Sequence, residues 1–374
     1  MSIIFKVTKN QLMQIANWQK SRCSLTMNSV NPIIIRNASG KSLVYKEYGE
    51  PSKVLVLTSA QEKKPQANEV SVKWLLAPVN PADINTIQGK YPSKPQLPAV
   101  PGNEGLGEII EVGSGVTAFK PGDRVVPNGS NLGTWTSYAT YASNQLLKIP
   151  QSIAAVEACM LNVNPCTAYR MLMDFVKLEP GDCVIQNGGN SAVGQFVIQL
   201  CRIWKLKSVN IVRDRPDIDK LKSELTQLGA TWVLTEQEFR KTDLFKSGKA
   251  EKPLLGLNCI GGQNALDLLR QIGHGGTMVT YGGMSREPVT VPTSALIFKD
   301  LILRGFWMTA WTKENEKSQQ RLDMIEHLGK LFESKELRAP PHKLVPLSKY
   351  HEAIEKTLKL DGKTGVKYIL DIST

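Results

Sequence analysis

The stretch Gln186-Asn187-Gly188-Gly189-Asn190-Ser191-Ala192-Val193-Gly194 decides the fold of this chain. It follows a short apolar run at residues 183–186 and opens a helical pattern over residues 192–205. Gly188 and Gly189 can form a tight turn, and the amide groups at the start of the helix can bind a pyrophosphate. Ser191 replaces the middle glycine of a G-x-G-x-x-G motif, so the motif depends on its context. The stretch predicts the first strand, turn and helix of a dinucleotide-binding domain.

Strand and helix patterns alternate after this stretch. A strand is predicted over 208–212, a helix over 217–228 that ends at Gly229, and a strand over 232–234. The alternation continues through residues 254–259, 264–272, 277–281, 293–298 and 301–306. Such alternation predicts an α/β fold with a doubly wound parallel Rossmann sheet.

The region before residue 150 has β-type patterns. Short apolar runs at 54–57, 70–75, 107–112 and 124–126 are separated by turn residues, which predicts a β-rich, barrel-like domain. Residues 153–173 have a helical pattern, and an amphipathic helix is predicted over 319–332. A last strand at 366–370 has no obvious partner in the α/β half, so we expect it to return to the β-rich domain.

Length and composition agree with two globular domains. The chain has 374 residues, of which 41% are hydrophobic and 21% charged, so it can bury a large core. These values exclude a largely disordered chain. No run of 18 apolar residues occurs, so no membrane span is expected.

The first residues are basic and contain no acid before Glu47. The stretch holds Lys6, Lys9, Lys20, Arg22, Arg36, Lys41, Lys46 and several serines. This composition predicts a mitochondrial transit peptide over residues 1–40 and a location in the matrix, with a disordered basic tail as the alternative. The net charge is +12, and loss of five basic residues with the leader leaves +7. A basic surface favours an acidic partner or substrate.

Cysteine and histidine spacing does not predict a metal site. The cysteines are Cys23, Cys159, Cys166, Cys183, Cys201 and Cys259, and none form a C-x-x-C pair. We interpret them as reduced core residues. No histidine lies at metal-ligand spacing from a cysteine or an acid.

The end of the predicted strand 208–212 favours one nicotinamide cofactor over the other. Arg213-Asp214-Arg215 lies about 20 residues after the glycine loop, where the adenosine ribose is recognised. Two guanidinium groups favour a 2′-phosphate and therefore NADPH. Asp214 is ambiguous, because an acid at this point could accept from a ribose 2′-hydroxyl instead.

Several motifs together resemble the medium-chain dehydrogenase/reductase superfamily. They include Asn80-Pro81-Ala82-Asp83, the stretch from Pro101 to Gly107 and the turn from Pro121 to Val125. Within the superfamily the chain is most similar to the mitochondrial trans-2-enoyl-thioester reductases of type II fatty acid synthesis. The more specific motifs are those at residues 80–91, 162–169, 213–216, 281–284 and 305–307. The resemblance implies a GroES-like catalytic domain over 41–163 and 314–374, and a Rossmann domain over 164–313.

The resemblance also implies a zinc-free reduction. Zinc alcohol dehydrogenases of the superfamily have a histidine where this chain has Asn103, and the structural run of four cysteines is absent. The implied reaction is NADPH-dependent reduction of trans-2-enoyl thioesters to saturated acyl thioesters. Hydride goes to the β carbon, and Tyr91 donates a proton to the α carbon. The residues alone do not distinguish Tyr91 from Tyr138, Tyr141 or Tyr169.

The same resemblance implies a set of cofactor contacts. They are Asn164, Asn190, Ser191, Ala192, Val193, Arg213, Asp214, Arg215, Tyr281, Gly282, Gly283, Met284, Phe306, Trp307, Met308 and Lys367. Several have plain structural alternatives. Asn164 precedes a proline, so its role could be no more than to start a helix. Trp307 could be an ordinary core residue. A lysine in a terminal strand, such as Lys367, is usually solvated.

Partners follow from charge and resemblance. A positive chain suits an acidic acyl carrier protein or the phosphates of coenzyme A, with Lys90 and Lys94 as candidates for the docking surface. Family members form homodimers, and residues 296–308 are the expected edge. One alternative is an NADPH quinone oxidoreductase of the same superfamily. Another is a non-catalytic, NADPH-sensing RNA-binding protein, although no nucleic-acid-binding motif occurs.

Overall fold

The computed structural model describes residues 39–358 and 365–374. Almost all of the predicted transit peptide, and Cys23 with it, lies outside these residues. The two described residues of the predicted leader belong to β1 (Ser39–Val44), which pairs antiparallel with β2 (Val56–Gln61). A cleavage before Ser39 would therefore leave this hairpin whole.

The β-rich part is a seven-stranded sheet with the order β14-β15-β3-β4-β5-β7, and β6 pairs with β3. Its strands are β3 (Glu69–Pro78), β4 (Leu106–Val112), β5 (Arg124–Pro127), β6 (Tyr138–Ala142), β7 (Leu146–Lys148), β14 (His342–Pro346) and β15 (Lys367–Asp371). β15 pairs antiparallel with β3 through Ile369 and Pro78. The expected return of the last strand to the β-rich domain is confirmed.

Short helices in the β-rich part depart from the predicted pattern. Residue 54, predicted as strand, ends α2 (Pro51–Val54), because the proline at the start favours a helical turn. We did not predict α3 (Pro81–Ile87), the 3₁₀ turns Ser143–Gln145 and Leu347–Lys349, or α13 (Tyr350–Leu358). The Asp83 carboxylate in α3 accepts from the backbone amide of Asn80 at 2.8 Å, which holds the start of this helix.

The single helix predicted over 153–173 is wrong. It is divided into α4 (Ala155–Cys159) and α5 (Asn164–Asp174). Pro165 stands in the first turn of α5, where its missing N–H costs no hydrogen bond. Inside one continuous helix the same ring would clash with the preceding turn.

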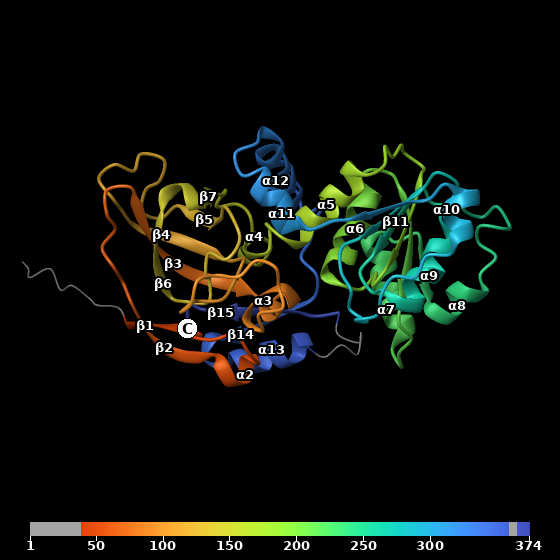
Figure 1. The fold of residues 1–374 in the computed structure, drawn as a ribbon. Coiled ribbons are helices and arrows are strands. Elements are labelled where there is room, and N and C mark those ends of the chain that lie inside the picture. Colours follow the sequence, from red (N-terminus) through yellow and green to blue (C-terminus); the bar gives the residue numbers. More distant parts are fainter. Residues whose placement is uncertain (1–38, 359–364) are drawn as a thin grey trace, which may run out of the picture. The chain divides into compact units, whose positions relative to one another are not determined.

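The second sheet is parallel and has six strands in the order β10-β9-β8-β11-β12-β13 (Figure 1). The strands are β8 (Cys183–Asn187), β9 (Lys207–Val212), β10 (Trp232–Thr235), β11 (Leu255–Asn258), β12 (Thr277–Thr280) and β13 (Ile302–Gly305). The helices between them are α6 (Ala192–Ile203), α7 (Ile218–Leu228), α8 (Glu236–Lys241), α9 (Gly262–Gln271) and α10 (Thr293–Lys299). The strand order reverses between β8 and β11, where doubly wound sheets bind ligands. The predicted Rossmann fold is confirmed.

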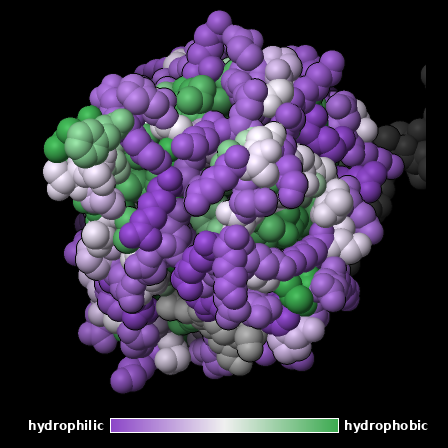
Figure 2. Space-filling model, turned by 90° about the vertical axis from the view of Figure 1, so that its right-hand side faces the viewer, coloured by the Kyte–Doolittle hydropathy of each residue, from purple (hydrophilic) through white to green (hydrophobic). Residues whose placement is uncertain are grey.

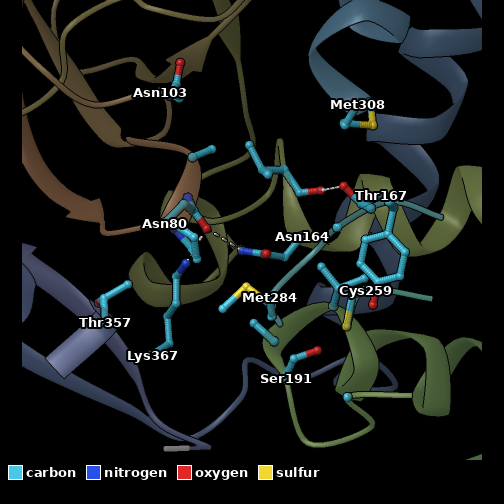
Figure 3. A pocket seen from close by; sticks show the side chains of 18 of the residues that line it. Asn80, Asn103, Asn164, Thr167, Ser191, Cys259, Met284, Met308, Thr357 and Lys367 are labelled. Carbon is cyan, nitrogen blue, oxygen red and sulfur yellow. Dashed lines mark hydrogen bonds between the residues drawn. The ribbon is translucent and has the colours of Figure 1, made fainter. Parts of the chain in front are cut away.

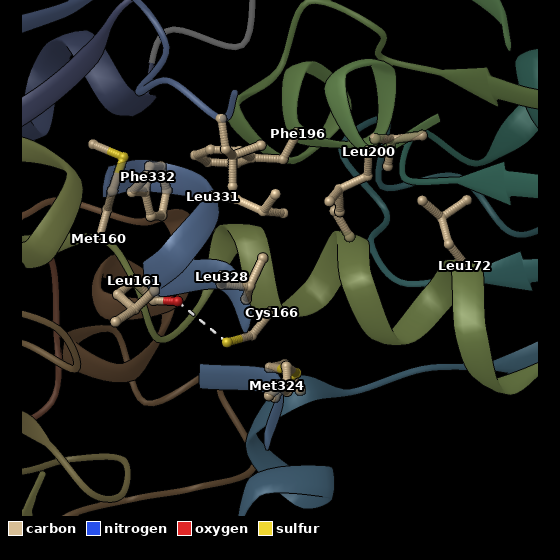
Figure 4. Packing of buried hydrophobic residues seen from close by; sticks show 14 of the residues in the cluster. Met160, Leu161, Cys166, Leu172, Phe196, Leu200, Met324, Leu328, Leu331 and Phe332 are labelled. Atoms are coloured by element: carbon tan, nitrogen blue, oxygen red, sulfur yellow. Dashed lines mark hydrogen bonds between the residues drawn. The ribbon is translucent and has the colours of Figure 1, made fainter. Parts of the chain in front are cut away.

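One buried apolar cluster joins the two parts of the chain. It combines Leu106 and Val126 of the antiparallel sheet with Leu255 of the parallel sheet. Helices α5, α6 and α12 (Gln319–Glu333) meet there, and Phe196 packs edge-to-face on Phe332 with ring centroids 6.0 Å apart (Figure 4). Burying side chains of this size stabilises the junction by about 1.5–3 kcal/mol each. This packing holds the ends of β8 and β11 against the β-rich part.

The five described cysteines are unpaired and buried, as predicted. Within residues 39–358 and 365–374, no helix is long and apolar enough to cross a membrane.

Candidate active site

A cavity of about 530 Å³ lies where the parallel strand order reverses. It is lined by most of the predicted site residues. They are Tyr91, Asn164, Asn190, Ser191, Ala192, Val193, Arg213, Tyr281, Gly282, Gly283, Met284, Phe306, Trp307, Met308 and Lys367. Asp214 and Arg215 are not among the residues that line it. The structure therefore brings together residues from both domains around one space (Figure 3).

The turn after β8 has no room for side chains. Gly188 has φ +62°, and a Cβ there would lie 2.6 Å from the Cys259 sulfur. A Cβ on Gly194 would lie 2.6 Å from the Gly188 carbonyl oxygen. Only glycine allows this turn and the close packing of α6 on it. These contacts give the incomplete motif its physical basis.

The first turn of α6 faces the cavity. The Ser191 hydroxyl accepts from the amide of Gly194 at 3.1 Å and caps the helix. Helix geometry leaves the amides of Ala192 and Val193 without partners inside the helix, and both residues line the cavity. An anionic group at this point gains these donors and the positive end of the helix dipole.

Two buried amides join the strand ends below this turn. Asn187, at the end of β8, donates through Nδ2 to Oδ1 of Asn258, at the end of β11, over 2.8 Å. The Asn187 side-chain oxygen accepts from the amide of Cys259 at 2.8 Å. The pair fixes the spacing of the two strands where the cavity opens. We did not predict this role, because buried asparagines at strand ends have no spacing signal.

The residues after β9 behave differently from one another. Arg213 lines the cavity. The Asp214 carboxylate accepts from the backbone amide of Arg215 at 2.9 Å, and the Arg215 side chain is 8% exposed and does not line the cavity. Arg213 and Arg215 were both expected at the 2′-phosphate, with Asp214 ambiguous, and of the three Arg213 lines the cavity.

Tyr91 and Trp307 form a close pair at the cavity wall. The Trp307 indole N–H donates to the Tyr91 hydroxyl oxygen at 2.6 Å, and the rings meet edge-to-face with centroids 5.6 Å apart. Tyr91 follows α3, where its amide donates to the Asn85 carbonyl at 3.1 Å. Because the indole uses an acceptor position of the phenol, the phenol keeps its own proton for another partner.

Polar side chains are linked by hydrogen bonds beside this pair (Figure 3). The Asn80 Oδ1 accepts from Lys367 and from Asn164, the latter at 3.3 Å, and its Nδ2 donates to Glu104 at 2.7 Å. Glu104 also accepts from the backbone amide of Val163 at 2.7 Å. Asn80 therefore links the buried Lys367 amine and the buried Glu104 carboxyl group through one amide.

Burial sets the protonation of this group. It raises the pKa of Glu104 to about 8 and also raises the pKa of Asp83. Burial lowers the pKa of Lys367, although both acids act against that shift. Burial therefore favours the neutral forms of Glu104, Asp83 and Lys367.

Asn80, Asp83 and Glu104 belong to the quoted family motifs, but we did not predict them as site residues. All three are buried, with exposures of 5%, 1% and 0%. In the sequence they are distinguished only as polar residues within apolar motifs. That pattern indicates a site only when the burial of the side chains is known.

Potential metal ligands do not gather in the described residues. No group of three or more His, Cys, Asp or Glu side chains there could hold a metal ion. The Asn103 amide, at the position compared with a histidine, donates to the Asp83 carboxylate at 2.6 Å.

Comparison with known proteins gives the family. Residues 66–151 match the Alcohol dehydrogenase GroES-like domain, and residues 192–327 match the Zinc-binding dehydrogenase family. The mitochondrial enoyl-[acyl-carrier-protein] reductase of Homo sapiens is 48% identical over 320 residues, which cover 85% of this chain and 86% of that protein. The chain belongs to the mitochondrial enoyl-[acyl-carrier-protein] reductase family.

Solved structures agree with this family. A complex of Etr1p with NADP and crotonyl-CoA superposes with a TM-score of 0.83 at 33% identity, covering 89% of this chain and 99% of that one. The mitochondrial 2-enoyl thioester reductase Etr1p/Etr2p heterodimer from Candida tropicalis gives 0.82 at 33% identity, with the same coverage.

Proposed function

We propose that this protein reduces trans-2-enoyl thioesters to saturated acyl thioesters with NADPH, as the last step of mitochondrial fatty acid synthesis. One observation carries the proposal: a hydrogen-bonded phenol, Tyr91, shares a cavity with a dinucleotide-binding turn. Membership of the enoyl-[acyl-carrier-protein] reductase family supports the substrate class and the mitochondrial location.

The residues at one end of the cavity suit NADPH. The glycine turn and the amides of Ala192 and Val193 would hold the pyrophosphate, and Arg213 would bind the 2′-phosphate. We place the nicotinamide beside residues 281–284, with Asn164 and Lys367 near its ribose. Tyr281 follows β12, and its backbone amide donates to the Asn258 carbonyl at 2.9 Å, while Gly282 and Gly283 line the cavity wall. Asn190, Phe306 and Met308 complete this lining.

When bound, NADPH supplies a hydride from its nicotinamide ring to the β carbon of the substrate. Negative charge then develops on the thioester oxygen, and the α carbon becomes basic. Tyr91 is positioned at the cavity wall to donate its hydroxyl proton there.

Trp307 assists this transfer in the proposal. As Tyr91 loses its proton, its oxygen becomes more negative, and the indole N–H at 2.6 Å stabilises that charge. The interaction is stronger in the transition state than in the resting site, which is the condition for catalysis rather than binding. Trp307 is therefore a helper of Tyr91 and not a proton source.

We infer that the protein forms a homodimer through the outer edge of the parallel sheet. All four residues of β13 are exposed at this edge, and neighbouring α10 exposes Leu296, Ile297 and Phe298, the last at 76%. Figure 2 faces the side of the molecule where α10 lies and shows apolar patches in a mainly hydrophilic surface. The predicted edge at 296–308 is part helix and part strand, because residues up to Lys299 belong to α10. The solved heterodimer of Etr1p and Etr2p supports the formation of a dimer.

We propose the carrier of the acyl chain from the net charge of the protein. The net charge of +7 that remains without the predicted leader favours an acidic acyl carrier protein, and Lys90 and Lys94 next to Tyr91 are candidate contacts. Exchange of both lysines for glutamate should raise KM for an acyl-carrier-protein substrate more than KM for the CoA thioester.

A cofactor oxidation assay tests the function. Crotonyl-CoA should be reduced with NADPH much faster than with NADH, and quinones should be poor substrates. Faster turnover of quinones than of enoyl thioesters would favour the quinone oxidoreductase alternative. RNA binding at 0.2 M salt without thioester reduction would favour the RNA-binding one.

A further inference from the structure

The segment that carries Tyr91 depends on other parts of the protein for its shape. Residues 88–98, all of them described by the structure, form no helix or strand. Helix α3 holds the start of the segment, because the amides of Lys90 and Tyr91 both donate to the Asn85 carbonyl, at 2.9 and 3.1 Å. Backbone outside helices and sheets is positioned by the contacts that it makes. The contacts directly after Tyr91 therefore decide where the phenol lies beside Trp307.

Asn131 makes such a contact with Ser93, two residues after Tyr91. The Asn131 Nδ2 donates to the Ser93 hydroxyl oxygen at 2.5 Å. Pro92 stands between Tyr91 and Ser93, and its ring fixes one of the backbone angles that separate them. Ser93 and Asn131 are both partly exposed, so water can replace either partner and the bond adds little to stability. The effect of the bond is to limit where the backbone of Tyr91 can lie.

Asn131 is itself held by a chain of hydrogen bonds. Its φ is +58°, in the left-handed region that asparagine adopts more readily than most residues. Its backbone amide donates to the Asn103 side-chain oxygen at 2.7 Å, and Asn103 lines the cavity (Figure 3). Asn103 in turn donates to Asp83 of α3, which is 1% exposed. The chain of bonds that starts on α3 ends at Ser93. Helix α3 therefore holds the segment on both sides of Tyr91.

Another contact on the same segment lies farther from the phenol. The Tyr48 hydroxyl donates to the Pro95 carbonyl at 2.7 Å, four residues after Tyr91. The Lys94 Nζ lies over the Tyr48 ring, 5.5 Å from its centroid. This contact holds the outer part of the segment, and the Asn131 contact lies between it and Tyr91. Loss of the Tyr48 hydrogen bond should therefore leave the phenol in place.

We propose that Asn131 is a positioning residue for the proton donor: through Ser93 it holds the Tyr91 phenol within reach of the substrate α carbon. The inference rests on the proposed function and deepens it. The reaction is unchanged, since hydride from NADPH adds at the β carbon, the phenol proton adds at the α carbon, and water returns a proton to the phenol. Asn131 touches none of these atoms. Its loss should slow the proton transfer and leave cofactor binding intact, because a displacement of about 1 Å in a reacting group can cost much of the rate.

The test compares Ser93→Ala and Asn131→Gly with the wild type in the reduction of crotonyl-CoA. Alanine removes only the hydroxyl, and glycine keeps the left-handed conformation. Both variants should lower kcat by about tenfold and leave KM for NADPH within about twofold of the wild type. The solvent isotope effect on kcat in D₂O should rise in both, because proton transfer becomes slower relative to hydride transfer. Asn131→Asp should recover most of kcat, since its carboxylate accepts from the Ser93 hydroxyl.

Tyr48→Phe is the matched control. It keeps the ring, removes a hydrogen bond from the same segment, and should keep the kcat and the isotope effect of the wild type. Combined with Tyr91→Phe, Ser93→Ala and Asn131→Gly should cause almost no additional loss of kcat. Equal losses with and without the phenol hydroxyl would overturn the proposal, and so would an unchanged kcat and isotope effect in the single variants. Should Asn131→Gly fail to fold, Ser93→Ala decides by the same measurements.

These assays separate the positioning role from the proposed function. If the wild type does not reduce crotonyl-CoA, the proposed function falls and the inference falls with it. If the wild type reduces crotonyl-CoA and Tyr91→Phe loses most of kcat while Ser93→Ala does not, only the positioning role is wrong.

Discussion

The two ends of the cavity are built in different ways. The cofactor end comes mainly from one continuous stretch, residues 186–194, whose glycines and helix start are adjacent in sequence. The reaction end joins Tyr91 to Trp307 across 216 residues and Asn80 to Lys367 across 287. A site built from one stretch can be recognised from the spacing of its residues in the sequence. A site built from residues far apart in the sequence depends on the whole fold. The predictions below compare the two ends, from the largest expected effect to the smallest.

Removing the phenol hydroxyl should cause the greatest loss. Tyr91→Phe keeps the ring against Trp307 but has no proton to donate, so kcat for crotonyl-CoA should fall by about 10²–10⁴-fold. The Kd for NADPH, measured by cofactor fluorescence, should stay as in the wild type, since the cofactor end is untouched. Near-normal turnover would remove Tyr91 from the proposed role.

Removing the Arg213 cation at the cofactor end should weaken NADPH binding and reduce the preference for NADPH over NADH. Arg213→Ala should raise KM for NADPH by about 10–100-fold, because a charge-assisted bond to the 2′-phosphate is lost. KM for NADH serves as the internal control and should change little. An equal rise in KM for both cofactors would show that Arg213 does not bind the 2′-phosphate.

Trp307→Phe tests the helper of the phenol. The substitution keeps an aromatic edge beside Tyr91 but removes the N–H donor, so kcat should fall by about tenfold with KM for NADPH unchanged. Its effect should nearly vanish in the Tyr91→Phe background, because the two residues act on one proton. Additive losses in the double variant would contradict this coupling.

Glu104→Gln tests the buried polar group. Its two carboxylate oxygens accept from Asn80 and Val163, and the new NH₂ would face one of these donors. We expect KM for NADPH to rise severalfold as Lys367 loses its support, with kcat less affected. The frustrated hydrogen bond should cost about 1–3 kcal/mol in the free energy of unfolding.

The same variant predicts a change in pH dependence. Burial raises the pKa of Glu104 to about 8, so the folded protein holds this proton longer than the unfolded chain does. Its contribution to stability is present below the ordinary carboxyl pKa and is lost as pH rises to about 8. The wild type should therefore lose stability relative to Glu104→Gln between about pH 6 and about pH 8, measured by urea unfolding. A constant difference between the two proteins would contradict the raised pKa.

Sequence patterns predicted most of the parallel sheet, because each strand and helix there is a short local unit. They also predicted that the last strand leaves this sheet, from the lack of a partner. The break before α5 was missed, although Pro165 was visible, because apolar periodicity continued across it. At the site, the glycine turn could be predicted from the sequence. Asn80 and Glu104 could not, because their importance comes from burial beside Lys367. Arg215 was expected beside Arg213, but it is buried and is not among the residues that line the cavity.

Isotope tracing tests the central claim most directly. The protein is given crotonyl-CoA with NADPH carrying deuterium at both C4 positions, and in a separate run with unlabelled NADPH in D₂O. The account predicts a single deuterium at C3 of butyryl-CoA in the first run and a single solvent deuterium at C2 in the second. Cofactor deuterium at C2, or no transfer to the acyl chain, would contradict it.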